Sequence, residues 1–426
     1  MFRENDFLNK LLGRGRKIIP TKVFKLVQPA YHWCLSMLGA FIYRFPSRAM
    51  KVVAVTGTKG KSTTVFMISK IFEDQGEPVA AIGSLGFKIK EQTWPNTLKM
   101  TLPGRLKLQK FLYRAKKAGC KYVVLEATSE GIAQNRLAGV KIDCAVFTNL
   151  HREHLESHGS FENYLAAKQK LFLKTKNKHI LNIDDPYFEK FANYPARTKI
   201  TYGRQWGLIS LLRQPVSNLH LQLLGDFNDY NALAALAVAY AYNLDLDKAV
   251  ESLNSIKFIP GRMEIIDAEF KDSRFKVVID YAHTPDSLEA VYRNLKPSAK
   301  KLICILGAAG GGRDKWKRPE FGKIAAKYCD EIILTNEDPY DENPAEILEQ
   351  ISAGFSQISS LKSQPPKYQK ILDRREAIRK GLMLAKDGDI VVITGKGSET
   401  SIAVAGGKKI PWSERAVVEE ILSAAP

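Results

Sequence analysis

The segment V-T-G-T-K-G-K-S-T-T at Val55–Thr64 has the composition of a phosphate-binding loop. It follows a short β-branched run and opens a helical pattern, so its glycines could let backbone N–H groups surround a phosphate at a helix N-terminus. Lys61 would reach the β- and γ-phosphates of a nucleotide, and the Ser62 hydroxyl would bind magnesium. The general pattern G-x-x-x-x-G-K-[ST] requires glycine where Val55 stands, so this is a shortened variant. A chance glycine-rich turn is the alternative, which the strand-turn-helix context disfavours.

A second group of residues could hold a metal ion. Glu126 follows the strand-like run 122–125, where a carboxylate is well placed for magnesium, a hard cation that prefers oxygen ligands. An ordinary surface glutamate is the alternative. Three histidines, spaced so that they can share a helical face, follow the next strand at His151, His154 and His158. Magnesium uses imidazole sparingly and no H-E-x-x-H supports zinc, so this cluster is ambiguous. Lys168, taken alone, is typical of a solvated helix lysine.

Alternating strand-like and helix-like runs must position these residues. Strand-like runs occupy 51–55, 122–125, 144–147 and 180–183, and the alanine-rich segment 228–242 has helical spacing. After the Pro260-Gly261 junction, a second series has strand-like runs at 276–279, 301–306, 331–334 and 390–393. This alternation predicts an α/β fold. We expect a central parallel-sheet P-loop ATPase domain over residues 49–258 and a Rossmann-like α/β C-terminal domain over residues 259–426.

The composition narrows the class of protein. The chain has 426 residues, 45% of them hydrophobic and 26% charged, which is typical of a soluble globular protein with two or three domains. Its five cysteines are far apart and form no C-x-x-C pair. This spacing argues against a zinc ribbon or a disulfide framework and favours a reducing cytoplasm.

The net charge of +19 is concentrated at the N-terminus. Residues 1–51 contain ten Lys or Arg and two acids, Glu4 and Asp6, so they carry +8. The apolar, aromatic-rich stretch 23–45 is interrupted by Gln28, Pro29 and His32, which makes it a poor membrane span. One hypothesis is that segment 1–48 forms a basic helix on an anionic membrane surface, at the inner face of the membrane. The alternative is a helix packed on the next domain with a solvated basic face.

Further motifs give the chain a family resemblance. They are T-S-E-G-I-A-Q-N-R from residue 128, F-T-N-L-H-R-E-H-L-E-S-H-G from 147, Y-L-A-A-K from 164, G-D-F-N-D-Y-N from 225, G-R-M-E from 261, D-Y-A-H-T-P-D-S-L from 280, G-G-R-D-K-W-K-R-P from 311 and T-G-K-G-S-E from 394. In this order, and with the phosphate loop, they resemble the Mur ligase family, most closely its MurE-type members. The resemblance covers about residues 50–399.

The resemblance implies roles for single residues. Catalytic roles fall to Lys61, Glu126, His154 and Lys168. The implied metal ligands are Ser62, Glu126, His154 and Lys168, the last as a carbamylated lysine that helps to hold the second of two Mg²⁺ ions. The implied ATP-binding residues are Gly57, Thr58, Lys59, Gly60, Lys61, Ser62, Thr63, Asn228, Asn231, Arg262, Asp280 and His283. The implied substrate-binding residues are Thr101, Thr128, Gln134, Arg136, Arg313, Glu337, Asp338, Tyr340, Gly395 and Glu399.

The implied reaction is amide-bond formation in peptidoglycan precursor synthesis. A muramoyl-dipeptide carboxylate attacks the γ-phosphate of ATP, and the amine of an amino acid then attacks the acyl-phosphate. Closure of the two domains would protect that intermediate from water, with Pro260-Gly261 as a hinge. The expected partners are the muramoyl peptide and the amino acid, and no nucleic acid. We expect a cytoplasmic monomer.

Three departures from the family pattern bear on the substrates. Only about 50 residues precede the phosphate loop, too few for the usual uridine-binding domain, so a lipid-linked acceptor is an alternative to a UDP-linked one. Where diaminopimelate-adding relatives read D-N-P-R, this chain has Glu337-Asp338-Pro339-Tyr340, and tyrosine cannot form the bidentate ion pair of arginine. Lysine or another diamino acid is therefore an alternative to diaminopimelate. Glu130 and Lys59 replace a usual histidine and asparagine.

Three other functions are weighed from the residues: another ligase, a nucleic-acid-binding ATPase and a non-catalytic scaffold. A folylpolyglutamate synthase-like ligase would use the same chemistry on a related scaffold, although D-Y-A-H-T-P-D-S-L and G-K-G-S-E favour the MurE type. A nucleic-acid-binding ATPase would account for the charge, but the chain has no recognised nucleic-acid-binding motif. The intact Lys61, Glu126, His154 and Lys168 disfavour a non-catalytic scaffold.

Overall fold

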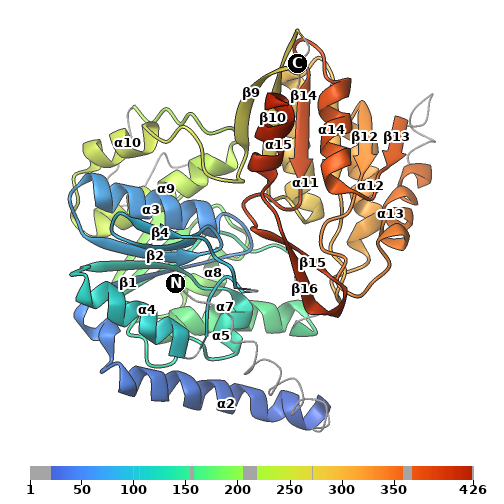
Figure 1. Cartoon of the computed structure of the whole chain (residues 1–426). Coiled ribbons are helices and arrows are strands. Elements are labelled where there is room, and N and C mark those ends of the chain that lie inside the picture. The colour runs from blue at the N-terminus through green and yellow to red at the C-terminus, as the bar shows by residue number, and fades with distance from the viewer. Residues whose placement is uncertain are drawn as a thin grey trace. The chain divides into compact units, whose positions relative to one another are not determined.

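The computed structural model describes residues 21–98, 100–104, 106–153, 158–204, 218–270, 272–357 and 367–424. They divide into two α/β units. Unit 1 runs to Gln222 and includes Asp226–Ile256, and unit 2 comprises Leu223–Gly225 and the chain from Lys257 (Figure 1).

Unit 1 is built around an eight-stranded sheet in the order β4-β3-β2-β5-β1-β6-β7-β8. Its elements are α2 (Thr21–Ile42), the 3-10 helix η1 (Pro46–Ala49), β1 (Lys51–Thr56), α3 (Lys61–Asp74), β2 (Val79–Gly83), β3 (Gly86–Ile89), β4 (Gln92–Trp94), α4 (Leu106–Lys117), β5 (Tyr122–Glu126), α5 (Ser129–Ala133), β6 (Cys144–Phe147), α7 (Phe161–Lys174), β7 (Lys178–Asn182), α8 (Phe188–Ala192), β8 (Thr198–Tyr202), α9 (Phe227–Ala241) and α10 (Leu246–Asn254).

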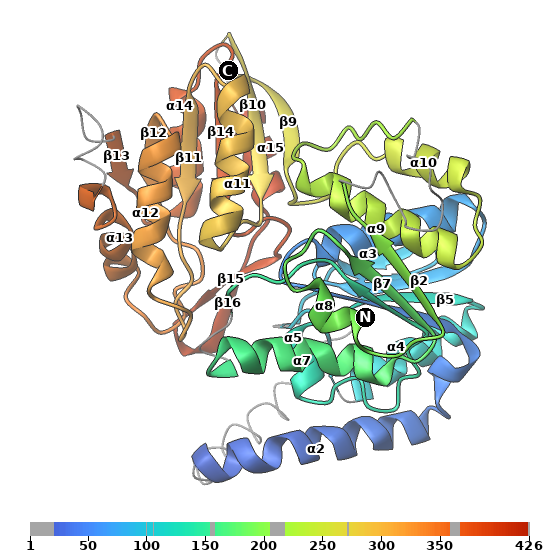
Figure 2. The same ribbon diagram turned by 180° about the vertical axis from the view of Figure 1, so that it is seen from behind.

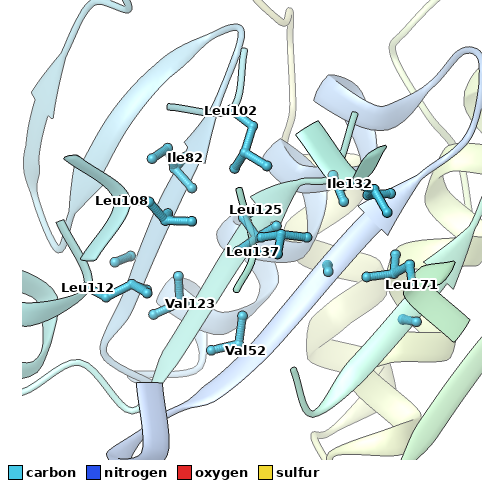
Figure 3. Close-up of a cluster of buried hydrophobic side chains, with 14 of the residues drawn as sticks. Val52, Ile82, Leu102, Leu108, Leu112, Val123, Leu125, Ile132, Leu137 and Leu171 are labelled. Atoms are coloured by element: carbon cyan, nitrogen blue, oxygen red, sulfur yellow. The ribbon is translucent and has the colours of Figure 1, made fainter. Parts of the chain in front are cut away.

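The centre of this sheet is buried on both faces. Strand β1 is buried from Val52 to Thr56, as expected for a parallel strand covered by helices on both sides. Helices α3 and α9 cover one face, and α4, α5 and α7 cover the other, with α2 lying outside α4 (Figures 1 and 2). Figure 3 shows the core under α4, where Ile82, Leu108 and Val123 meet with almost no exposed surface.

Unit 2 contains a six-stranded sheet in the order β13-β12-β11-β14-β10-β9 and a hairpin of β15 and β16. Its elements are β9 (Glu264–Phe270), β10 (Ser273–Asp280), α11 (Pro285–Leu295), η2 (Lys296–Ser298), β11 (Leu302–Leu306), α12 (Lys317–Tyr328), β12 (Glu331–Leu334), α13 (Pro344–Ser352), η3 (Phe355–Gln357), β13 (Lys367–Lys370), α14 (Arg374–Leu384), β14 (Ile390–Thr394), β15 (Ser401–Val404), η4 (Ala405–Gly407), β16 (Lys408–Pro411) and α15 (Glu414–Ser423). Separate apolar clusters lie on the two faces of the sheet, so it too is a covered sheet.

The predicted α/β fold is confirmed, and its sheets are mixed instead of wholly parallel. In unit 1, β3 and β4 extend one edge as antiparallel strands, and in unit 2 β9 pairs antiparallel with β10. These edge strands are short or alternate between buried and exposed residues. They lack the continuous apolar runs that mark central parallel strands, so their residues do not predict them as strands.

Two of the five cysteines form a disulfide, although the cysteine spacing argues against a disulfide framework. Cys304 in β11 and Cys329 after α12 form a disulfide with a Cα–Cα distance of 6.0 Å. Because β11 pairs in parallel with β12, the crossover helix α12 returns the chain beside the strand it left. Distance along the sequence therefore gave no indication of their distance in space. Cys34 is exposed, and Cys120 and Cys144 are buried free thiols.

Candidate active site

The carboxyl ends of three neighbouring strands bring the unit 1 motifs together. Strand β1 pairs in parallel with β5 and β6, so Val55 lies opposite Glu126 and Thr56 lies opposite Phe147. The phosphate loop, the Glu126 carboxylate and the loop after Phe147 consequently meet at one edge of the sheet. After β1 the chain continues to β2 on one side of this strand, whereas after β5 it continues to β6 on the other side. Open α/β sheets bind ligands at the point where the strand order reverses in this way.

Two glycines shape the phosphate loop. Gly57 has φ 154° and Gly60 has φ 79°, which side-chain-bearing residues rarely adopt. A Cβ on Gly57 would overlap Thr148 Oγ1, and one on Gly60 would overlap Asn231 Oδ1. The loop therefore packs too closely against α9 and the segment after β6 to accept alanine at either glycine.

Hydrogen bonds from the loop after β6 hold the phosphate loop in place. The Thr58 N–H donates to the Asn149 carbonyl and the Lys59 N–H to Asn149 Oδ1, each at 2.9 Å. Thr148 Oγ1 donates to the Lys59 carbonyl at 2.7 Å. The Thr58 hydroxyl lies 2.9 Å from the Tyr164 hydroxyl of α7. Next along the chain, three predicted ATP-binding residues form the first turn of α3: Lys61, Ser62 and Thr63.

Two lysine ammonium groups converge on one carbonyl of this loop. Lys61 Nζ donates to the carbonyls of Gly57 at 3.0 Å and Thr58 at 2.7 Å, and Lys168 Nζ donates to Gly57 at 2.6 Å. Lys168 is only 1% exposed, so its sequence-based interpretation as a solvated helix lysine is wrong. Burial first and Lys61 second hold the pKa of the Lys168 amine well below its usual value, with Glu153 acting in the opposite direction.

A chain of hydroxyls joins the helix N-terminus to the strand-end carboxylate. Ser62 Oγ lies 2.6 Å from Ser84 Oγ, and Glu126 Oε1 accepts from both the Ser84 N–H at 2.9 Å and the Ser84 hydroxyl at 3.0 Å. Glu126 is 2% exposed and is therefore no ordinary surface glutamate. Ser84 is absent from the sequence-based set. Ser84 could have been predicted from the apolar run V-A-A-I-G before it, because this run marks β2 as another strand that ends at this edge.

Two of the three clustered histidines, His151 and His158, lie in the described residues. His154 lies outside the described residues. The His151 side chain is exposed, and its backbone N–H donates to Thr58 Oγ1 at 2.9 Å. His158 Nε2 lies 3.1 Å from Ser129 Oγ, and burial lowers the pKa of this imidazole while Glu130 opposes that shift.

The described oxygen donors fit a magnesium ion. Within the described ranges, no three His, Cys, Asp or Glu side chains gather into a metal cluster. The hydroxyls of Ser62 and Ser84 and the buried Glu126 carboxylate are, however, the hard oxygen groups that Mg²⁺ accepts beside nucleotide phosphates and water. One protein carboxylate is enough for such a site.

The candidate acceptor-binding residues form a group that flanks helix α5, with Thr128 at its start and Gln134 and Arg136 at and after its end. Thr128 caps the helix by accepting from the Gly131 N–H. Gln134 Oε1 accepts from Arg136 Nε at 3.1 Å and Nη2 at 2.7 Å, while Arg136 Nη1 donates to the Leu102 carbonyl at 2.9 Å. Arg136 thus connects this group to the loop that contains Thr101.

The two predicted adenine-pocket asparagines are neighbours on α9. Both are buried, and Asn231 Nδ2 donates to Asn228 Oδ1 at 3.2 Å. Thr64 Oγ1 donates to Asn231 Oδ1 at 3.3 Å, which connects this pair to α3.

In unit 2, the predicted ATP contacts surround the end of β10. The Arg262 guanidinium lies 4.3 Å from the centroid of the Tyr281 ring. Asp280 accepts from the backbone N–H groups of Met263 and Ala282, each at 2.7 Å, and burial raises its pKa while Arg262 opposes that shift. His283 Nδ1 lies 2.8 Å from the Tyr281 carbonyl.

The predicted amino-acid pocket contains a buried ionic network around Lys396, another residue absent from the sequence-based set. Lys396 is fully buried and pairs with Asp338 at 2.8 Å and with Glu399. Asp338 Oδ1 also accepts from the Ala403 N–H at 2.7 Å. Glu399 further accepts from the Tyr281 hydroxyl at 3.1 Å.

Three more predicted pocket residues lie on the loops after β11, β12 and β14. Tyr340 is in the left-handed region with φ 52°, and its N–H donates to the Ala403 carbonyl. Gly395 has φ 108°, and a Cβ there would overlap Glu337 Oε2. Arg313 is exposed on the loop between β11 and α12.

Arg374, at the start of α14, ties two of these loops together. Its Nε donates to Glu414 Oε1 at 2.7 Å, and both side chains are almost fully buried. Its Nη1 and Nη2 donate to the carbonyls of Asn336 at 2.9 Å and Thr394 at 2.8 Å, next to Glu337 and Gly395.

Family models match most of the chain. The Mur ligase middle domain matches residues 55–239, and the Mur ligase glutamate ligase domain matches residues 261–397. The chain belongs to the Mur ligase family. The resemblance inferred from its motifs is thereby confirmed, as is its nature as an ATP-dependent ligase of this family.

Similar proteins support a MurE-type member. This Mur ligase is 36% identical to the UDP-N-acetylmuramyl-tripeptide synthetase of Roseiflexus sp. (strain RS-1), over 96% of this chain and 85% of that protein. It is also 36% identical to the UDP-N-acetylmuramoyl-L-alanyl-D-glutamate–2,6-diaminopimelate ligase of Thermosynechococcus vestitus, over 92% and 80%. A solved structure of a ligase with that same name is 30% identical with a TM-score of 0.59, over 92% and 83%. E. coli FolC in complex with DHPP and ADP shares the fold, with a TM-score of 0.65 at 19% identity over 85% and 89%.

We expect the stability of this Mur ligase to depend on the protonation of Glu337. Burial, reinforced by Asp338, raises the pKa of this carboxyl from 4.5 to about 7. The folded state therefore holds a proton that the unfolded state releases, so this contribution is complete below about pH 4.5 and is lost as pH rises through about 7. Denaturant unfolding at a series of pH values should show a smaller fall in stability over this window for Glu337→Gln than for the parent. Parallel pH profiles would contradict this assignment.

Proposed function

We propose that this Mur ligase joins an amino acid to the carboxylate of a muramoyl dipeptide at the expense of ATP, as its MurE-type relatives' names describe. The observation that carries the proposal is the convergence of Lys61, Lys168 and the Ser62–Ser84–Glu126 chain on one phosphate loop. A simple nucleotide-binding loop needs no second buried lysine. Charge stabilisation on a transferring phosphoryl group requires several such groups in one place.

The reaction consists of two displacements. A carboxylate oxygen of the dipeptide attacks the γ-phosphorus of ATP, the bond to the bridging oxygen breaks, and ADP leaves. The amine of the amino acid then attacks the acyl carbon, phosphate leaves with the bonding electrons, and the nitrogen loses a proton. Lys61 and the N-terminus of α3 neutralise the negative charge that develops on the phosphoryl oxygens. Mg²⁺ would be held by Ser62 and Glu126, with His154 as a further proposed ligand, and would add to this charge neutralisation.

We further propose that Lys168 acts as a carbamate. Its amine would attack CO₂, lose a proton and become an N-linked carboxylate, a hard oxygen ligand suited to a second Mg²⁺. Support comes from its position, because Nζ lies 2.6 Å from the Gly57 carbonyl in the phosphate loop and 4.5 Å from the centroid of the Tyr164 ring. An ammonium group buried at that point would repel a metal ion, whereas a carbamate would bind it.

We propose that the added amino acid is a diamino acid. This enzyme would select its distal carboxylate less strongly than diaminopimelate-adding relatives do. Tyr340 offers a single hydroxyl where an arginine would form a bidentate pair. Asp338 and Glu399 are already engaged with Lys396, so the buried Glu337 beside Gly395 is the acid left for an incoming ammonium group. Lysine and diaminopimelate are both included in this proposal.

The test is phosphate release from ATP and magnesium by the purified full chain. We expect release only when a muramoyl-dipeptide acceptor and an amino acid are both present, with diaminopimelate, lysine and ornithine compared on UDP-linked and lipid-linked acceptors. Release that depends on a pteroylglutamate would favour the folylpolyglutamate synthase-like alternative. Release driven by DNA or RNA, with no response to any acceptor, would overturn the ligase proposal.

The proposal places the enzyme in the cytoplasm as a monomer, with a peripheral association at the inner membrane face through the N-terminal segment. Within the described residues, no helix has the length and apolarity needed to cross a membrane.

A further inference from the structure

Helix α2 packs on unit 1 through its small and polar residues. His32, Ser36 and Ala40 recur at helical spacing and are at most 6% exposed. Close approach to α4 depends on Gly39, where an added Cβ would come within 3.2 Å of Leu106 Cα. Helix α2 therefore packs on the domain that follows it, as one of the two hypotheses for segment 1–48 requires. The contact is made by a face of α2 that carries mostly small side chains.

Over residues 30–42, where the side chains of α2 are described, its outward face is apolar instead of basic. Its large side chains are exposed by 41% at Tyr31, 49% at Trp33, 50% at Leu38, 72% at Phe41 and 53% at Ile42. This polarity is the reverse of that of a surface helix in a water-soluble domain, which turns its apolar stripe toward the core. Neighbouring apolar side chains left outside mark an interaction surface.

Basic side chains border this apolar face at its C-terminal end. Phe41 and Ile42 line a hollow of about 680 Å³ together with Arg44, Arg48 and Lys116. Helix α4, which lies beside α2 in both ribbon views, exposes further cations along its length: Lys110, Arg114, Lys116 and Lys117 (Figures 1 and 2). No aspartate or glutamate occurs in residues 7–72 or 92–125, so the segments that form this surface contain no acid.

The backbone at the end of α2 is held in an unusual conformation. Arg44 and Phe45 have φ of 54° and 47°, a left-handed pair that costs energy in residues other than glycine. The Phe45 N–H closes the helix by donating to the Ala40 carbonyl at 2.7 Å, and the Arg48 guanidinium lies 4.4 Å from the centroid of the Phe45 ring. This turn brings the two arginines next to the exposed Phe41.

We propose that the outward face of α2 and the basic face of α4 together dock on an anionic lipid bilayer. The aromatic and aliphatic side chains would enter the interface between headgroups and acyl chains, while the cations contact lipid phosphates. This inference rests on the peripheral membrane association in the proposed function. It adds α4 to the docking surface, and it identifies membrane-contacting residues outside segment 1–20.

Charge complementarity favours an anionic bilayer over two other possible partners of this surface, a second copy of the chain and residues 1–20. A second copy of this chain would place basic α4 against basic α4. Residues 1–20 hold five Lys or Arg and two acids, so this leader is also basic and would be repelled by the same surface. An anionic membrane supplies both the apolar layer and the negative charge that the surface lacks.

The test uses point variants of the full chain, so that the leader is present in every sample. Partitioning onto phosphatidylcholine vesicles is compared with partitioning onto phosphatidylcholine–phosphatidylglycerol vesicles by sedimentation. We expect binding to the anionic vesicles that weakens with salt and falls at least about tenfold in Phe41→Ser/Ile42→Ser and in Lys110→Glu/Lys116→Glu. Two matched controls on α7, Leu173→Ser and Lys170→Glu, replace an exposed leucine and an exposed lysine and should bind like the parent.

Three results would overturn the proposal. They are equal binding by the parent and both double variants, equal binding to neutral and anionic vesicles, and a concentration-dependent dimer that is lost in Phe41→Ser/Ile42→Ser without any vesicle binding. Amide-ligase activity with soluble substrates is measured in the same preparations. Activity that is retained while vesicle binding is lost separates this surface from the proposed reaction.

Discussion

Replacing Lys168 with methionine should lower the kcat for amide formation by about 10²–10³-fold, the scale seen when one transition-state charge stabiliser is removed. Methionine approximately conserves the volume of a side chain that is 1% exposed, so the loss should reflect the missing nitrogen and not a cavity. Phosphate release at saturating substrates provides the measurement. Incubation with short carboxylic acids should restore part of the activity of the smaller Lys168→Ala variant, because a free carboxylate can take the place of the carbamate.

The control for this prediction lies on the same helix. Lys170 is exposed, and Lys170→Met should keep the activity of the parent. Nuclear magnetic resonance of protein labelled with ¹³C-bicarbonate should show a carbamate carbon in the parent that is absent from Lys168→Met. Full activity in Lys168→Met would remove this residue from the mechanism, while loss of activity without a carbamate signal would leave it as an amine in the phosphate loop.

Replacing Arg374 with methionine should destabilise unit 2 by about 3–5 kcal/mol, the usual cost of removing one partner from a buried ion pair. The change leaves the Glu414 carboxylate buried without its guanidinium and frees the carbonyls of Asn336 and Thr394. Denaturant unfolding followed by tryptophan fluorescence is suitable, because Trp412 packs against an apolar cluster of this unit.

A neighbouring arginine provides the matched control. Arg375 pairs with Glu420 at 2.7 Å, but both side chains are substantially exposed, so Arg375→Met should leave the stability of unit 2 close to that of the parent. In Arg374→Met/Glu414→Leu the unpaired charge is gone, and part of the stability should return. Equal effects of Arg374→Met and Arg375→Met would show that burial of the first pair has no energetic consequence.

The site could be predicted best where a functional residue directly follows a parallel strand. The run before Lys61 and the run before Glu126 are continuous apolar strands, and parallel strands end at one edge, so their meeting could be predicted. Ser84 was missed because a serine after a short run has no distinctive pattern, although it bridges Ser62 and Glu126. The burial of Lys168 could not be read from helical spacing, because it depends on which face of α7 meets the phosphate loop.

Tertiary packing explains the other differences. Cys304 and Cys329 meet because a crossover helix returns the chain to its starting strand, which spacing alone does not reveal. One of the two hypotheses for the N-terminal segment was a helix with a solvated basic face, yet the described outward side chains are mainly aromatic and aliphatic. Lys396 belongs to the motif T-G-K-G-S-E, but its role as the centre of an ionic network depends on Asp338, which is distant along the chain.

The contacts of Arg374 with its two loops also bear on how substrate preference can evolve. Its bonds to Asn336 and Thr394 are made to backbone carbonyls, which every amino acid supplies. Side chains in these loops can therefore be exchanged without loss of those contacts, and the loop positions are preserved while the pocket chemistry changes. Tyr340, which the family resemblance aligns with an arginine of diaminopimelate-adding enzymes, would be an exchange of this kind. A new amino-acid preference can thus be reached through single substitutions while the fold stays constant.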